Sequence, residues 1–211
     1  MDTTDSHRAS VRSGIGIEWF SAGWMIVEAA VAVLAGVMAH SVALIAFGAD
    51  SVIELIAGGA LLWRLYVEAN HADSERVEKA ERTASWIVGI GLLALAVYIV
   101  AAAIRSLLVR EGPETAPLGI AVTAASSVLM PFIAASKKKI GCRIGSAALE
   151  SDGSCSMVCA YMSWIVLGGV LLTALVGWWW IDAVASLGLV YFVIHEGWEA
   201  LADAREAPAR G

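Results

Sequence analysis

Long apolar stretches separated by short polar segments recur along the whole chain. A helix needs roughly 20 apolar residues to cross a hydrocarbon core about 30 Å thick. Stretches of this length predict six membrane-spanning helices, at residues 17–39, 41–66, 83–108, 115–136, 143–176 and 179–200. They are much longer than the ~10-residue strands of a membrane barrel and lack the alternation of such strands. The predicted fold class is therefore an all-α membrane protein.

Little of the chain is left outside these spans. We expect an N-terminal segment at residues 1–16, a six-helix transmembrane domain at 17–200 and a short tail at 201–211. The tail is too short to fold as a domain of its own. The first span exceeds the apolar region of a signal peptide, so we expect it to stay uncleaved.

Composition agrees with a lipid environment. The sequence is 59% hydrophobic and 16% charged, with a mean hydropathy of +0.73, which is more apolar than ordinary soluble domains. The net charge of −6 comes with acids and bases interleaved in short segments, and it indicates no nucleic-acid partner. Three cysteines, two of them within one predicted span, do not form a secreted disulfide framework.

The positions of the basic residues predict the orientation of the chain. Alternate assignment of the loops leaves only Arg105 and Arg110 on one side, and the other twelve Lys and Arg residues lie on the side of the two termini. The positive-inside rule then predicts that both termini are cytoplasmic. We expect a multi-pass protein of a bacterial-type plasma (inner) membrane.

Asp50 and Glu54 lie near the middle of the second predicted span. Ionisable groups within a membrane are costly, so each is a functional hypothesis by default. The two carboxylates are one helical turn apart on one face, and they would repel each other unless a cation or a proton lay between them. A structural carboxyl group, protonated or hydrogen-bonded within the bundle, is the alternative.

Cys155 and Cys159 repeat this spacing in the fifth predicted span. Thiols four residues apart on a helix meet disulfide geometry poorly. Two carboxylates and two thiolates from facing helices would supply the four ligands of a tetrahedral zinc-like ion, and thiolates favour softer metals over magnesium or calcium. Because buried cysteines are often only small apolar residues, that alternative stays open for the thiols.

At these residues the sequence resembles the cation diffusion facilitator family of metal transporters. Three stretches resemble its helix 2 motif, the basic turn and acidic start of its helix 5, and its helix 6: ALIAFGADSVIEL at 43–55, KKKIGCRIGSAALESDG at 137–153 and WWWIDAVASLGLVYFVIHEGWEAL at 178–201. The resemblance implies a cation-efflux-like bundle in which helices 2 and 5 each offer a ligand pair to a midplane ion. On this chain the pairs would be Asp50 with Glu54 and Cys155 with Cys159.

The sequence departs from the family pattern in two ways. The usual helix 5 pair is His and Asp, whereas this chain has two cysteines, so the metal preference of typical members does not carry over. Members commonly add a cytoplasmic metal-binding domain after helix 6, so the resemblance is to an atypical member with the membrane domain only. We therefore expect any homodimer to form through the membrane domain.

Two further acids lie within predicted spans. Glu28 is near the middle of the first span, and Asp152 lies on the same stripe of the fifth span as the cysteines. We predict that each is an additional ligand or a proton carrier. For Glu28 the alternative is a carboxyl group satisfied by an interhelical hydrogen bond.

These observations predict a transporter rather than an enzyme. The leading hypothesis is proton-coupled efflux of a divalent cation by alternating access, because carboxylates and thiols bind metal only when deprotonated. Zinc is the first choice of ion, with cadmium or another thiophilic divalent ion next. The alternatives are a non-transporting membrane metal sensor or partner protein and, less favoured, a membrane thiol redox protein.

Overall fold

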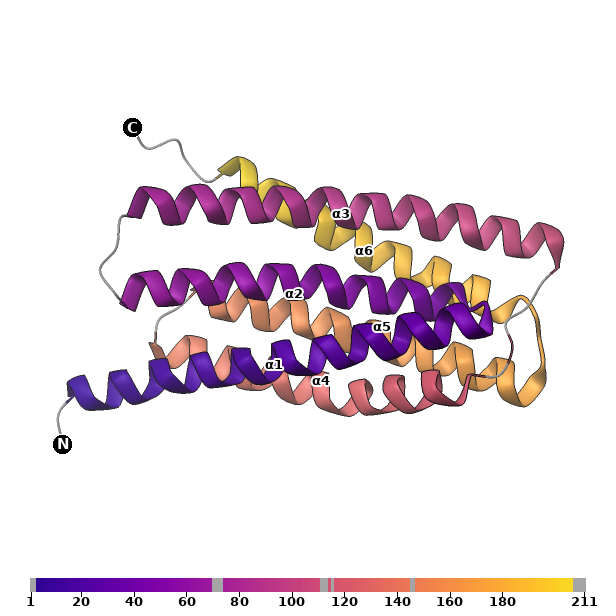
Figure 1. The fold of residues 1–211 in the computed structure, drawn as a ribbon, viewed down its shortest axis with the longest axis horizontal. Helices are drawn as coiled ribbons and strands as arrows, with labels where there is room; N and C mark the ends of the chain where they lie inside the picture. The colour runs from indigo at the N-terminus through magenta and orange to yellow at the C-terminus, as the bar shows by residue number, and fades with distance from the viewer. Residues whose placement is uncertain (1–2, 70–73, 111–113, 115, 145–146, 207–211) are drawn as a thin grey trace.

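The computed structural model describes the backbone of residues 3–69, 74–110, 114, 116–144 and 147–206 (Figure 1). Within these ranges, the side chains of residues 3–12, 64–69, 74–81, 84, 144, 147–148, 203 and 206 are outside the description. The described residues form six helices: α1 (Thr3–Ala39), α2 (Val42–Ala69), α3 (Ser74–Val109), α4 (Pro117–Ile144), α5 (Ala147–Val176) and α6 (Ile181–Glu206).

Each of these six helices, within its described residues, contains a stretch long and apolar enough to cross a membrane. The prediction of an all-α protein with six spanning helices is therefore confirmed. The helix bounds differ most at α1, which begins at Thr3 instead of near residue 17. Its apolar stretch begins at Ser13, so the helix continues beyond the predicted span into the polar segment.

The predicted boundary between the fourth and fifth helices, at residues 137–142, is wrong. Residues 137–142, which carry the run of three lysines, are expected to form a loop, but α4 continues through them to Ile144. The side chain of Lys137 is fully buried. A lysine can occupy such a position when carboxylates on neighbouring helices neutralise its charge, and hydropathy cannot detect those partners.

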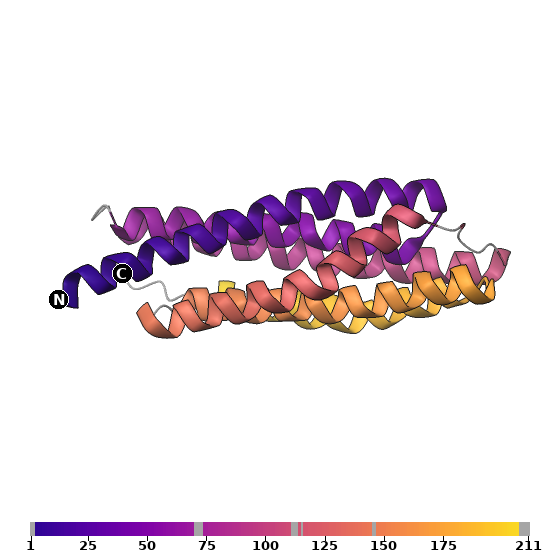
Figure 2. The same cartoon turned by 90° about the horizontal axis from the view of Figure 1, so that it is seen from below.

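The helices form two layers, as Figure 2 shows. One layer contains α1, α2 and α3, the other contains α5 and α6, and α4 runs obliquely from one layer to the other. Helix α2 packs against α1, α3, α5 and α6 and has the most buried apolar stretch of the six described spans. Helix α1 begins and α6 ends at the same end of the bundle (Figure 1), which we call the termini end. Polar groups on α2 are thus enclosed by neighbouring helices.

Two glycines allow the close helix contacts that set the site. A Cβ atom at Gly48 would lie 2.7 Å from Val33 Cγ2 and 2.9 Å from the backbone nitrogen of Val33, so α1 and α2 meet backbone to backbone there. A Cβ atom at Gly153 would lie 3.0 Å from the backbone nitrogen of Lys138. Small residues permit such approaches between membrane helices. They bring side chains of α1 against α2, and of α4 against α5.

At the end opposite the termini, α6 caps α2. Ser41 precedes α2, and its hydroxyl oxygen accepts a hydrogen bond from the backbone nitrogen of Leu44. Asp182, in the first turn of α6, accepts hydrogen bonds from the Ser41 hydroxyl (2.5 Å) and the backbone nitrogen of Val42 (2.8 Å). These bonds satisfy amide groups that an α-helix leaves free at its start. They also join the second and sixth helices at this end.

Candidate metal site

Asp50, Glu54 and Cys159 converge in the interior of the bundle. One ligand atom from each side chain lies within 4.8 Å of the others. The residues are 3%, 9% and 1% exposed, respectively. We call these three residues the acid–thiol cluster.

The geometry of α2 and α5 explains this convergence. Asp50 and Glu54 are one turn apart on α2, so their side chains lie on one face, and that face is turned toward α5, which packs against α2. Cys159 lies on the buried stripe of α5 together with Ser156 and Ser163. The two helices therefore present oxygen and sulfur donors to the same volume.

Among the described residues, only one of the two carboxylate oxygens of Glu54 accepts a hydrogen bond. Ser156 of α5 donates a hydrogen bond of 3.0 Å to Glu54 Oε1. The second oxygen, Oε2, is buried and has no hydrogen-bond partner among the described residues. A buried carboxylate oxygen without a donor is unfavourable, and it is a group for which a bound cation would supply the missing interaction.

Glu28 of α1 lies beside the acid–thiol cluster and is fully buried. Its two oxygens accept hydrogen bonds from Trp24 Nε1 (3.0 Å), Ser51 Oγ (2.5 Å) and Ser126 Oγ. The Cys159 sulfur lies 3.8 Å from Glu28 Oε1. The carboxyl group of Glu28 thus joins α1, α2, α4 and α5 around the Cys159 thiol.

Cys155, the other predicted thiol ligand, is not part of the acid–thiol cluster. It is half-buried and free, whereas Ser156 is buried and faces Glu54. Successive residues of an α-helix are separated by about 100° around its axis. With Ser156 and Cys159 both turned inward, Cys155 lies toward one side of that inward face.

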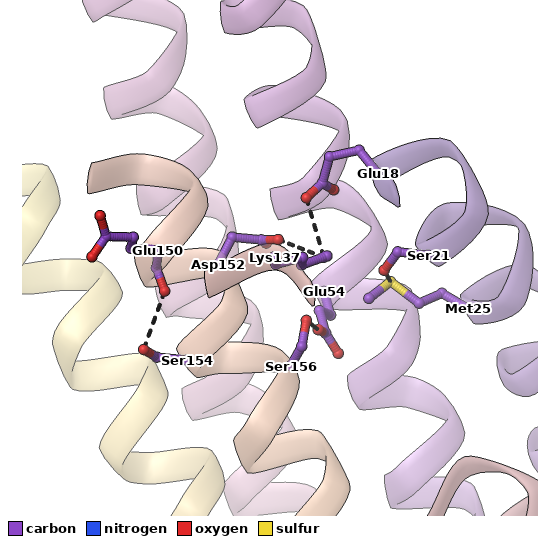
Figure 3. A network of polar contacts seen from close by, with 9 residues as sticks. All are labelled: Glu18, Ser21, Met25, Glu54, Lys137, Glu150, Asp152, Ser154 and Ser156. Atoms are coloured by element: carbon purple, nitrogen blue, oxygen red, sulfur yellow. Dashed lines mark hydrogen bonds and ion pairs between the residues drawn. The ribbon is translucent and has the colours of Figure 1, made fainter. Parts of the chain in front are cut away.

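Asp152 pairs with a lysine and is not part of the acid–thiol cluster. Lys137 Nζ of α4 lies 2.5 Å from Asp152 Oδ2 and 3.4 Å from Glu18 Oε1 of α1 (Figure 3). The side chains of Glu18, Lys137 and Asp152 are 2%, 0% and 10% exposed. We call these three residues the Lys137 network.

Glu18 was not among the site residues predicted from the sequence, although its spacing on α1 indicates it. Glu18, Ser21, Met25 and Glu28 recur at helical spacing along α1 and are all buried. Figure 3 shows the first three on the same side of α1, facing the interior of the bundle. A stripe of polar and small residues through an apolar helix indicates the face that packs within a bundle.

The acid–thiol cluster has the chemistry of a site for a thiophilic divalent ion. Two carboxylates and one thiolate carry enough negative charge for a dication, and sulfur favours zinc or cadmium over magnesium or calcium. The cluster combines these groups with little exposure to solvent. An ion bound there would have to reach and leave it by movement of the helices.

Comparison with known proteins identifies the family. Residues 19–207 match the cation efflux transmembrane domain. The chain belongs to this family. The resemblance found in the sequence is thereby confirmed, and the family is one of membrane transporters rather than of enzymes.

Two relatives cover most of the chain. An uncharacterized transporter of Synechocystis, sll1263, is 30% identical over 166 residues, which are 77% of this chain and 54% of the relative. Transmembrane protein 163 of Xenopus laevis is 26% identical over 195 residues, 91% of this chain and 67% of the relative. The matched part is thus about half the length of the first relative and two thirds of the second.

Proposed function

We propose that this protein moves a divalent heavy-metal cation, zinc as the first choice and cadmium next, across the membrane through the acid–thiol cluster. The single observation that carries the proposal is the convergence of Asp50, Glu54 and Cys159 from α2 and α5 within 4.8 Å. In a cation efflux bundle, a buried group of such donors is best explained as the position where the transported ion pauses.

The ligands that we propose are Asp50, Glu54, Cys159 and Cys155, the four required for a tetrahedral ion. For the fourth position we propose Cys155 and not Glu28, for the following reasons. Both oxygens of Glu28 already accept hydrogen bonds from Trp24, Ser51 or Ser126. Cys155 forms no disulfide and lies one turn from Cys159, so a modest rotation of α5 would suffice to turn its thiol inward.

We further propose that transport exchanges metal for protons. The ligand groups bind a metal only when they are deprotonated, so metal binding releases protons and proton arrival favours metal release. Glu28 borders the cluster and contacts the Cys159 thiol. It is our candidate for the group that accepts a proton when the ion binds.

The direction that we propose is efflux from the cytoplasm, with both termini cytoplasmic in a bacterial-type plasma membrane. The excess of Lys and Arg in the segments at the termini end supports this orientation. The ion would reach the acid–thiol cluster from the termini end and leave at the other end. A homodimer formed through the membrane domain remains part of the proposal.

Metal flux into liposomes tests the proposal. Purified protein is reconstituted into vesicles that contain a metal-sensitive dye, and zinc, cadmium or magnesium is added outside. Wild-type protein should carry zinc and cadmium but not magnesium. The double variant Asp50→Asn with Glu54→Gln should reduce flux to that of empty vesicles.

Glu114→Gln is the matched control, because Glu114 is an exposed acid near the end opposite the termini, and it should retain wild-type flux. Metal binding by wild-type protein without flux would indicate the alternative, a membrane metal sensor. Wild-type flux through the double variant would show that the proposed site is wrong.

A further inference from the structure

The Lys137 network joins three helices at one level of the membrane domain. Glu18 belongs to α1, Lys137 to α4 and Asp152 to α5, and the ion pairs of 3.4 Å and 2.5 Å both involve Lys137 Nζ. Removing charged groups from water costs several kcal/mol per ion even when the groups are paired. An apolar packing of these three positions would hold the helices together without that cost, so the charges suggest a role other than stability.

This network lies between the acid–thiol cluster and the termini end of the bundle. Glu18 precedes Glu28 by ten residues on α1, which is about 15 Å along a helix axis. Asp152 precedes Cys159 by seven residues on α5, or about 10 Å. Both offsets point toward the end at which α1 and α5 begin, so the network lies between that end and the acid–thiol cluster.

The Lys137 network and the acid–thiol cluster lie close together. Figure 3 shows Glu54 and Ser156 next to the Lys137 network, and Glu54 is near enough to Lys137 and Asp152 to interact with both electrostatically. Gly58, one turn beyond Glu54 on α2, lies against Glu18, since its Cβ position is 3.7 Å from Glu18 Oε2. The Lys137 network therefore forms the layer directly beside the cluster on this side.

We infer that Lys137 is a positioning residue. By holding Glu18 and Asp152 together, it blocks access to the acid–thiol cluster from the termini end of the bundle. The inference rests on the proposed transport function, in which the ion arrives from that end. An ion pair suits a closure that must open and reform. Its attraction is strong while the site is dry and weak once water enters and hydrates the separated charges.

The thiol of Cys159 gives a direct test, since it is 1% exposed behind the Lys137 network. In protein that carries Cys142→Ser and Cys155→Ser, it is the remaining cysteine. We would measure the rate at which a small cationic methanethiosulfonate modifies it in lipid nanodiscs without metal. Lys137→Met should raise this rate roughly tenfold by making local opening easier.

Matched variants separate this effect from others. Lys137→Arg keeps the charge and should retain the parental rate, and so should Lys139→Met, which removes an exposed lysine of the same helix. Asp152→Asn and Glu18→Gln change little in shape and should each raise the rate as well. They keep the test decisive if Lys137→Met does not fold.

A second reporter distinguishes closure from general loosening. Ala43 is fully buried at the start of α2, at the opposite end of the bundle. In protein that lacks all three native cysteines, the thiol of Ala43→Cys should react equally slowly with and without Lys137→Met. Faster reaction at both positions would show that Lys137 only stabilises the fold, and unchanged reaction at Cys159 in all three network variants would show that the network closes nothing.

Neither overturning result affects the proposed function, because the rates are measured without metal or flux. Conversely, if wild-type protein carried no metal in the liposome experiment, the expected reactivity of Cys159 in the network variants would be the same. The two proposals can therefore fail separately.

Discussion

Cys155 and Cys159 carry the same group one turn apart on α5, yet their surroundings differ. Cys159 is buried, lies in the acid–thiol cluster and contacts Glu28 Oε1 at 3.8 Å. Cys155 is half-buried and lies outside the cluster. A ligand already turned toward the other donors should contribute more to binding than one that must first be brought inward.

We therefore predict different effects of two serine substitutions. Cys159→Ser should weaken zinc binding by at least about 100-fold, because a direct ligand should matter more than the outer groups whose loss costs 10–100-fold. Cys155→Ser should weaken it by only about tenfold, the lower end of the loss for groups outside the ligand set, because Cys155 lies outside the acid–thiol cluster. Competition with a chelator of known affinity measures both values. Equal losses would show that the two thiols contribute alike, and a larger loss for Cys155→Ser would contradict the arrangement.

At the scale of single residues, the sequence predicted the two ligand pairs, Asp50 with Glu54 and Cys155 with Cys159. It did not predict which other side chains lie beside them. Asp50 and Glu54 were found because two acids in an apolar span are conspicuous and their spacing places them on one face. The position of Cys155 depends on the rotation of α5 about its axis, which the spacing of two cysteines leaves undetermined. Lys137 was assigned to a loop because hydropathy treats a run of three lysines as solvent-exposed.

Between helices, the contact of α1 with α2 depends on Gly48. Any side chain there meets Val33, including its backbone nitrogen at 2.9 Å. The same contact keeps Glu28 of α1 within hydrogen-bonding distance of Ser51 of α2. The close approach at Gly48 therefore supports the shell of hydrogen bonds around the acid–thiol cluster.

Replacing this glycine should be costly even with the smallest side chain. We predict that Gly48→Ala destabilises the protein by about 1–3 kcal/mol, because α1 and α2 must move apart. Thermal unfolding in detergent measures the change. Gly59→Ala is the control on the same helix, since its Cβ would meet nothing within 4 Å, and it should be neutral or slightly stabilising. Equal stability of the two variants would contradict the role assigned to Gly48.

The helices themselves were predictable because a span must be long and apolar to cross lipid. All six predicted spans correspond to helices among the described residues. Their ends were less predictable. The start of α1 is polar, and the last turns of α4 carry charges, so neither could be distinguished from a loop by hydropathy.

For the molecule as a whole, the arrangement places the Lys137 network and the acid–thiol cluster at successive depths from the termini end. Asp182 bonds α6 to the start of α2 at the opposite end. Alternating access requires helices to separate first at one end and then at the other. Polar contacts between helices thus occur on both sides of the proposed ion position.

Cys142 can report the proposed orientation. It is exposed and lies near the end of α4, at the termini end of the bundle. If that end is cytoplasmic, a membrane-impermeant maleimide should label Cys142 in inside-out vesicles but not in intact cells, with Cys142→Ser as the unlabelled control. Labelling in intact cells only would reverse the proposed direction of the chain.

The central claim is that the acid–thiol cluster binds the transported ion, and X-ray absorption of the bound metal tests it most directly. Zinc-loaded protein carrying Cys142→Ser should show oxygen neighbours and at least one sulfur neighbour at about 2.3 Å. The added substitution Cys159→Ser should remove a sulfur neighbour from any zinc that remains bound. A zinc environment without sulfur, or one that Cys159→Ser leaves unchanged, would contradict the claim.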